Sequence, residues 1–133
     1  MQEQIVPEAN PGHAESRLDL VIHSPLVAGG ILVDVTVVSA LSVESLAKGS
    51  AMKDGVAYRV ASDRKVDKYP GCTVYPFAIE AHGRFGESSC TLIKMLAPRG
   101  DAANRTRSIG NVYQAVASSV QRSNADAILA AAR

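Results

Sequence analysis

The sequence has no tryptophan, few aromatic residues and only two cysteines, and these absences exclude several classes of protein. Aromatic residues make up 5% of the chain, which leaves little for sugar stacking and makes a glycosidase-like carboxylate pair a distant choice. Cys72 and Cys90 lack CxxC spacing, so we expect both to be reduced thiols. The three histidines, His13, His23 and His82, lack metal-ligand spacing, so we do not expect a zinc site.

Long apolar runs are also missing. No uninterrupted stretch approaches the roughly 20 residues that span a bilayer, and residues 1–16 lack the positive and apolar regions of a signal peptide. We therefore expect an intracellular protein without a membrane partner.

Length and charge indicate one domain of modest basicity. The 133 residues are enough for one ordinary domain with its own core. Residues 1–16 hold two prolines, a glycine and three acidic residues without lysine or arginine, and we expect a flexible leader there. The remaining domain, 17–133, carries 14 basic and 10 acidic residues, a net charge of +4, which is compatible with contacts to phosphate.

Hydrophobic patterning predicts a mixed α/β (α+β) domain in which helices flank a small central sheet. Apolar, β-branched runs indicate strands, and proline or glycine marks most of the boundaries. The expected order is strand 18–22, loop 23–30, strand 31–39, a short helix or irregular segment 40–55, helix 56–69, strand 72–83, helix 87–97 and helix 108–132, with a polar loop before the last helix.

Two aspartates interrupt the first two predicted strands. If these strands form an antiparallel hairpin across loop 23–30, Leu20 faces Val33 and Asp19 faces Asp34. Like charges at facing positions are destabilising, and a divalent cation between them would turn repulsion into ligation. The alternative is that Asp19 is solvated at a strand end and that Asp34 makes a local hydrogen bond.

The predicted helix 56–69 places two lysines on the face expected to pack on the sheet. At 100° per residue, Lys65 and Lys68 share a face with small and aromatic residues, whereas Arg59 and Asp63 lie on the other side. The lysines could extend from this face into solvent. Alternatively, they could bring positive charge to the two carboxylates and to a phosphate beside them.

These residues together resemble a known family. Asp19 in DLVI, Asp34 in DVTVV and the later segment ASDRKVDKY (61–69) resemble the restriction-endonuclease-like domain of site-specific non-LTR retrotransposons, a branch of the PD-(D/E)xK nuclease superfamily. The segments PFAIEAHGRFG (76–86) and VASSVQRSNADAIL (116–129) are similar to the C-terminal ends of retroelement reverse-transcriptase polyproteins. The resemblance covers about residues 17–129.

The resemblance implies a restriction-endonuclease-like fold with a catalytic β-hairpin, and a metal-dependent endonuclease that nicks target DNA for retroelement insertion. It implies that Asp19, Asp34 and the carbonyl of Val35 hold Mg²⁺ or Mn²⁺. Thr36 occupies the place where many superfamily members have lysine, so Lys65 or Lys68 would take the catalytic role. Three further residues are candidates for support: Glu80, Tyr69 and Thr36.

The partners implied by the resemblance are DNA and a reverse-transcriptase domain or parent polyprotein, and the implied location is nuclear. The competing interpretation is a non-catalytic module that binds nucleic acid or a polymerase, or an inactive remnant of a retroelement protein. Dependence of DNA nicking on a metal separates these interpretations.

Overall fold

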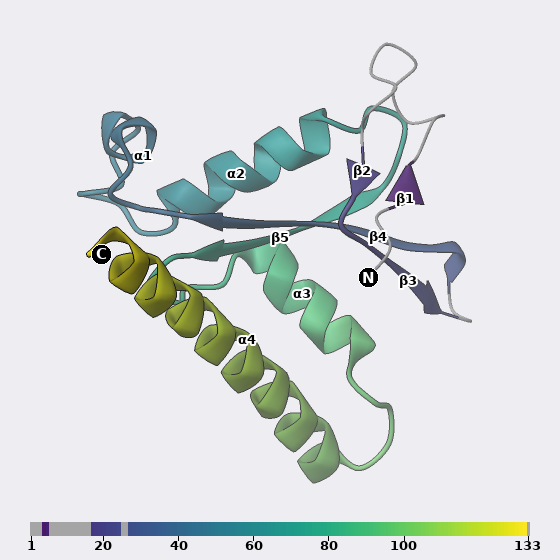
Figure 1. Cartoon of the computed structure of the whole chain (residues 1–133). Coiled ribbons are helices and arrows are strands. Elements are labelled where there is room, and N and C mark those ends of the chain that lie inside the picture. The colour runs from purple at the N-terminus through teal and green to yellow at the C-terminus, as the bar shows by residue number, and fades with distance from the viewer. Residues whose placement is uncertain (1–3, 6–16, 25–26, 133) are drawn as a thin grey trace.

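A three-stranded mixed sheet lies between helices in the computed structural model, which describes residues 4–5, 17–24 and 27–132 (Figure 1). The elements confirm the predicted α+β class and alternate much as the sequence indicates. They are β1 (Gln4–Ile5), β2 (Arg17–Leu18), β3 (Leu20–Ser24), β4 (Val27–Val38), α1 (Val43–Ala47), α2 (Val56–Asp67), β5 (Val74–Glu80), α3 (Glu87–Leu96) and α4 (Ala102–Ala131).

Strand β4 is the centre of the sheet, whose order is β3-β4-β5. β3 pairs with it antiparallel, and β5 pairs with it parallel. A parallel pair needs a crossover connection, and the chain between β4 and β5 supplies it through α1 and α2. This crossover places α2 over one face of the central strand, whereas Val35 and Val37 on the other face remain partly exposed.

The predicted hairpin register is confirmed. Leu20 pairs with Val33, Val21 with Leu32, and Ile22 with Ile31. The connection is shorter than loop 23–30, because β4 already begins at Val27. Gly29 and Gly30 have φ of 84° and 81°, a conformation that glycine adopts at no steric cost, so the strand continues through an irregular stretch beside the register shift between Ile22 and Ser24.

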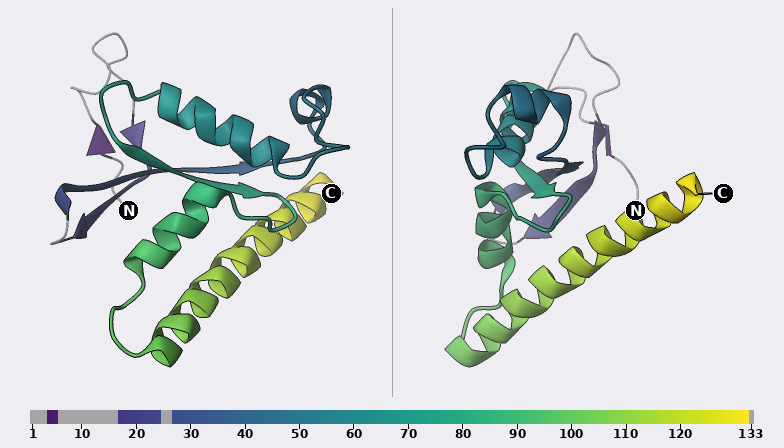
Figure 2. Two further views of the ribbon diagram at one scale, coloured as in Figure 1. Left: turned by 180° about the vertical axis from the view of Figure 1, so that it is seen from behind. Right: turned by 90° about the vertical axis from the view of Figure 1, so that its left-hand side faces the viewer.

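Residues of β4 alternate between two helical layers. α2 covers one face of the sheet, and α3 and α4 lie on the other (Figures 1 and 2). Val33, Val35 and Val37 line an apolar cavity with residues of α3 and α4. Because strand side chains alternate, Asp34 and Thr36 face α2.

The α2 layer packs through small and aromatic side chains. Tyr58 and Ala61 of α2 bury against Ala78 of β5. Arg59 and Asp63 are exposed, so the predicted helix phase is confirmed. The observed helix ends at Asp67, two residues before the predicted limit, because Pro70 and Gly71 follow closely.

Helix α4 begins earlier than predicted. The sequence indicated a polar loop up to residue 107, whereas the helix starts at Ala102. The side chain of Asp101 accepts a hydrogen bond from the backbone N–H of Asn104 at 2.9 Å, and this cap stabilises the polar first turns. None of the helices in the described ranges has the apolar character needed to cross a membrane.

Pro76 lies within β5 without interrupting it. β5 is at the edge of the sheet, where a missing N–H that points away from β4 is tolerated.

Part of the expected leader 1–16 forms a strand. Gln4–Ile5 pair antiparallel with Arg17–Leu18. The other leader residues lie outside the described ones.

Candidate active site

Asp34 is the buried acid of the central strand, with 1% of its surface exposed. It faces α2 and pairs across the sheet with Pro76 of β5. A carboxylate so deeply buried is costly unless cations or hydrogen bonds compensate its charge. Its surroundings therefore decide what the site can do.

Asp19 lies one residue before β3, next to the Leu20–Val33 pair that ends the hairpin ladder on this side. Its Oδ2 accepts a hydrogen bond from the backbone N–H of Val35 at 2.7 Å. This bond holds the Asp19 carboxyl at the edge of β4. The side chains of Asp19 and Asp34 also interact directly, as the facing register predicts.

Both predicted lysines reach Asp34. Lys65 Nζ lies 2.7 Å from Oδ1, and Lys68 Nζ lies 3.7 Å from Oδ2. The Lys65 side chain is 23% exposed and that of Lys68 is 43% exposed. Lys65 is thus the closer and more enclosed partner, and Lys68 lies nearer to solvent.

Tyr69 completes the cluster beneath the lysines. Its side chain is buried, and its ring centroid lies 4.9 Å from Lys68 Nζ, within cation–π distance. Burial and the neighbouring Asp34 carboxylate raise the pKa of Tyr69, so the phenol is protonated near neutral pH. The neutral hydroxyl interacts with the Asp34 carboxylate and helps to stabilise its negative charge.

The two carboxyl groups titrate in opposite directions. Burial alone would raise the pKa of Asp34, but hydrogen bonds from Lys65, Asp19 and Tyr69 outweigh it and lower that pKa. Burial raises the pKa of Asp19, the Val35 N–H opposes this, and the Asp34 charge adds to the rise. Asp19 therefore takes up the proton of the pair, and Asp34 carries the charge.

This asymmetry predicts that Asp19→Asn stabilises the metal-free protein at pH 7. A raised pKa in the folded state means that ionised Asp19 opposes folding above that pKa, and that this cost disappears below 3.8, the ordinary pKa of an aspartate. Asn mimics the protonated acid, so the free energy of unfolding should rise by roughly 0.2–1 kcal/mol, the range for cross-strand pairs. Urea unfolding in EDTA at pH 7 measures this gain, which should shrink as the pH falls towards 3.8.

Asp63→Asn is the matched control, because it removes the same charge from the exposed side of α2. This substitution should change the free energy of unfolding by no more than about 0.5 kcal/mol. A loss of stability in Asp19→Asn at pH 7 would show that the ionised carboxyl is a favourable part of the fold.

The remaining predicted residues lie at different distances from this cluster. Thr36 is two residues beyond Asp34 on the same face of β4 and pairs with Ala78. Glu80 pairs with Val38, so it lies four residues further along the sheet, or about 13 Å at roughly 3.3 Å per residue. The structure does not bring Glu80 to Asp34.

The cluster offers a restricted set of oxygen ligands. Asp34 Oδ2 is buried and has no hydrogen-bond partner of normal geometry in the described part of the chain. The carbonyl of Val35 points to the same edge of β4 as its N–H, which bonds Asp19, and β3 has no residue paired beyond Leu20 there. The described residues contain no group of three or more His, Cys, Asp and Glu that could hold a metal, so any ion here would depend on two carboxylates, a carbonyl and non-protein oxygens.

Sequence reasoning did not foresee the setting of Glu80. It was expected to support the Asp34 site, or else to be solvated near a strand end, yet it is 3% exposed and contacts His82 and Arg84. The alternation of β5 carried the available signal, because Glu80 follows buried Ala78 on the face towards α2.

Searches among protein-family models, curated proteins and solved structures found no match to this chain.

Proposed function

We propose that the chain is a metal-dependent DNA endonuclease domain that hydrolyses a phosphodiester bond and leaves a nick. The observation that carries the proposal is the convergence of Asp19, Asp34 and Lys65 at the end of the β-hairpin. A buried carboxylate with a second acid beside it and an ammonium 2.7 Å away combines the groups that bind a divalent cation and stabilise charge on a phosphate.

The acid pair would hold Mg²⁺ or Mn²⁺ with the carbonyl of Val35 as a further ligand. Two features support this assignment. Asp34 Oδ2 is a buried acceptor with no hydrogen-bond partner of normal geometry in the described residues, and Asp19 ionises reluctantly beside Asp34, which a bound dication would reverse. The ion would supply Lewis-acid polarisation of the phosphate and a water of lowered pKa.

The lysines would contribute positive charge at the reacting phosphate. Lys65 is held in place by its ion pair with Asp34, so its ammonium can orient a water or stabilise the pentacovalent phosphate without reorganisation. Lys68, more exposed and positioned over Tyr69, would contact a neighbouring phosphate. Thr36 is on the same face and is proposed as a supporting hydroxyl.

The biological setting proposed from the resemblance is target-site cleavage by a retroelement. The nick would prime reverse transcription, the partners would be DNA and a reverse-transcriptase domain or parent polyprotein, and the location would be the nucleus. A net charge of +4 over residues 17–133 gives modest general affinity for DNA, so the choice of target would reside in other domains.

Nicking of supercoiled plasmid by the purified chain tests the proposal. We expect relaxed circles to accumulate when Mg²⁺ or Mn²⁺ is added, and none to accumulate in excess EDTA. A chain that binds DNA but leaves the plasmid intact under both metals would instead be a non-catalytic module or remnant, in which Asp34 and Lys65 form a structural ion pair.

A further inference from the structure

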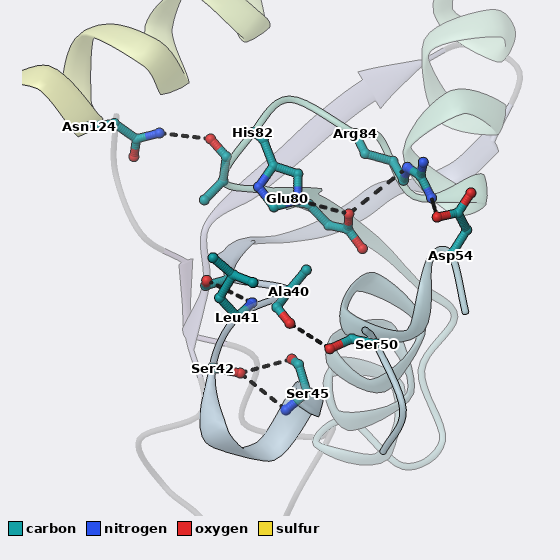
Figure 3. A network of polar contacts seen from close by, with 12 residues as sticks. Ala40, Leu41, Ser42, Ser45, Ser50, Asp54, Glu80, His82, Arg84 and Asn124 are labelled. Carbon is teal, nitrogen blue, oxygen red and sulfur yellow. Dashed lines mark hydrogen bonds and ion pairs between the residues drawn. The ribbon is translucent and has the colours of Figure 1, made fainter. Parts of the chain in front are cut away.

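A second polar pocket lies at the opposite end of α2 from the Asp34 cluster. Residues 40–41, 50–51 and 53–56 form one side, and Glu80, His82 and Arg84 form the other, around a cavity of about 270 Å³. Figure 3 shows the Glu80 carboxylate pointing from the end of β5 into the space towards Ala40 and Ser50. At roughly 30 Å³ per water, this volume corresponds to about nine waters, which is room for a small organic ligand.

Glu80 has an unused acceptor in this pocket. Its Oε1 is buried and has no hydrogen-bond partner among the described residues. The other oxygen, Oε2, lies 3.6 Å from His82 Nε2 and 4.0 Å from Arg84 Nε, distances too long for hydrogen bonds. A buried carboxylate in this state would be stabilised by a ligand that presents N–H donors.

The N-terminus of α2 opens on the same pocket. Gly55 is the N-cap residue, with φ of 74° and no side-chain capping bond, and both Gly55 and Val56 line the cavity. A Cβ at position 55 would lie 2.6 Å from the ring of Tyr58, so the position requires glycine. The uncapped backbone N–H groups and the helix dipole favour an anion here.

Charges of both signs surround the pocket, with Lys53 and Arg84 as cations and Asp54 and Glu80 as carboxylates. Arg84 is fixed by Asp54 at 3.1 Å, and Lys53 and His82 also line the cavity. The Asp54 carboxylate offsets the charge of Arg84, so Lys53 remains as the cation that a negative group would meet, and Glu80 remains as the acceptor for N–H donors. A ligand with a neutral N–H edge and a negative group satisfies both the acid and its basic surroundings.

We propose that this pocket binds a guanine nucleotide, with Glu80 accepting from the base and the phosphate lying at the N-terminus of α2. Guanine presents a ring N–H and an exocyclic amino group side by side, which matches the two oxygens of a carboxylate. Lys53 lines the same cavity as Gly55 and Val56 at that N-terminus and would contact the phosphate. The site goes beyond the proposed cleavage chemistry and uses none of its residues.

Calorimetric titration of the full chain in EDTA with GMP, IMP and AMP tests this assignment. IMP lacks the 2-amino group and AMP lacks both donors in this arrangement, so GMP should bind about 10-fold more tightly than IMP and still more tightly than AMP. This comparison uses the unmodified protein and does not depend on the folding of any variant. Equal affinities for the three nucleotides, or no saturable binding of GMP, would overturn the proposal.

Glu80→Gln should weaken GMP binding by about 10-fold, because only one acceptor remains. Glu44→Gln is the matched control, since it removes the same charge from an exposed side chain outside the pocket and should leave GMP affinity unchanged. Equal GMP affinity in Glu80→Gln and the unmodified chain would contradict the assignment.

Single-stranded oligonucleotides distinguish the two sources of the base. If the base belongs to DNA, an oligothymidine with one central guanine should bind about 10-fold more tightly than its inosine counterpart, and Glu80→Gln should erase that difference. If only free GMP shows this discrimination, the pocket binds a free nucleotide. These measurements need neither metal nor cleavage, so their failure is separable from failure of the nuclease proposal.

Discussion

Asp34→Asn is expected to abolish plasmid nicking, with a loss of at least about 100-fold, because loss of a proposed direct metal ligand should exceed the effect of losing an outer partner. Asn keeps the size of the side chain and an oxygen that can accept from Lys65, so the fold should persist. It removes the charge on which the proposed ion and the Lys65 ammonium both depend. Initial nicking rates on supercoiled DNA in Mg²⁺, with thermal unfolding as the check on folding, measure the effect.

Asp63→Asn provides the charge-matched control for this activity as well. It should nick at the rate of the unmodified chain, because Asp63 lies on the exposed side of α2. Activity of folded Asp34→Asn within about threefold of the unmodified chain would remove Asp34 from the site, given the magnitudes expected for a metal ligand.

Lys65→Met should separate metal binding from catalysis. Its ammonium contacts Asp34 Oδ1 at 2.7 Å, so it competes with a dication for the carboxylate. Removal of this cation should slow nicking by about 100-fold or more, the size expected for loss of one group that stabilises transition-state charge. At pH 8, where protons compete least with Mn²⁺ for the carboxylates, Lys65→Met should bind Mn²⁺ at least as tightly as the unmodified chain does. Single-turnover nicking and Mn²⁺ titration give the two quantities.

Lys68→Met removes the same charge from the more distant lysine, at 3.7 Å from Oδ2, and should cost less activity than Lys65→Met. Lys65→Arg retains the cation beside buried Asp34, so it should fold even if Lys65→Met is unstable. Its planar guanidinium cannot reproduce the compact ammonium, and we expect the nicking rate to fall at least about 10-fold. The catalytic role would belong to Lys68 if Lys65→Arg kept full activity and Lys68→Met lost more activity than Lys65→Met.

The sequence was sufficient to predict the cluster around Asp34 because two independent periodicities meet there. Strand alternation and the hairpin register placed Asp19 opposite Asp34, and the 100° step of the helix placed Lys65 and Lys68 over the sheet. These regularities are local, so they need no knowledge of tertiary contacts beyond the assumption that α2 packs on the sheet.

Features that depend on long-range geometry were not predictable in the same way. The burial of Glu80 follows from parallel pairing of Val38 with Glu80, and that pairing follows from the crossover through α2. The early start of α4 depends on one capping bond from Asp101, which outweighs the polar, loop-like composition of the residues after it. In both places tertiary or capping interactions decided an outcome that composition left open.

The most direct test of the proposed metal site is a Mn²⁺ titration, in which binding is measured as loss of the electron paramagnetic resonance signal of the free ion. We predict that the unmodified chain binds one Mn²⁺ and that Asp34→Asn leaves the ion free at the same concentrations, because the two carboxylates are the proposed charged ligands. Absence of binding by the unmodified chain, or equal binding by Asp34→Asn, would contradict a metal site at Asp19 and Asp34.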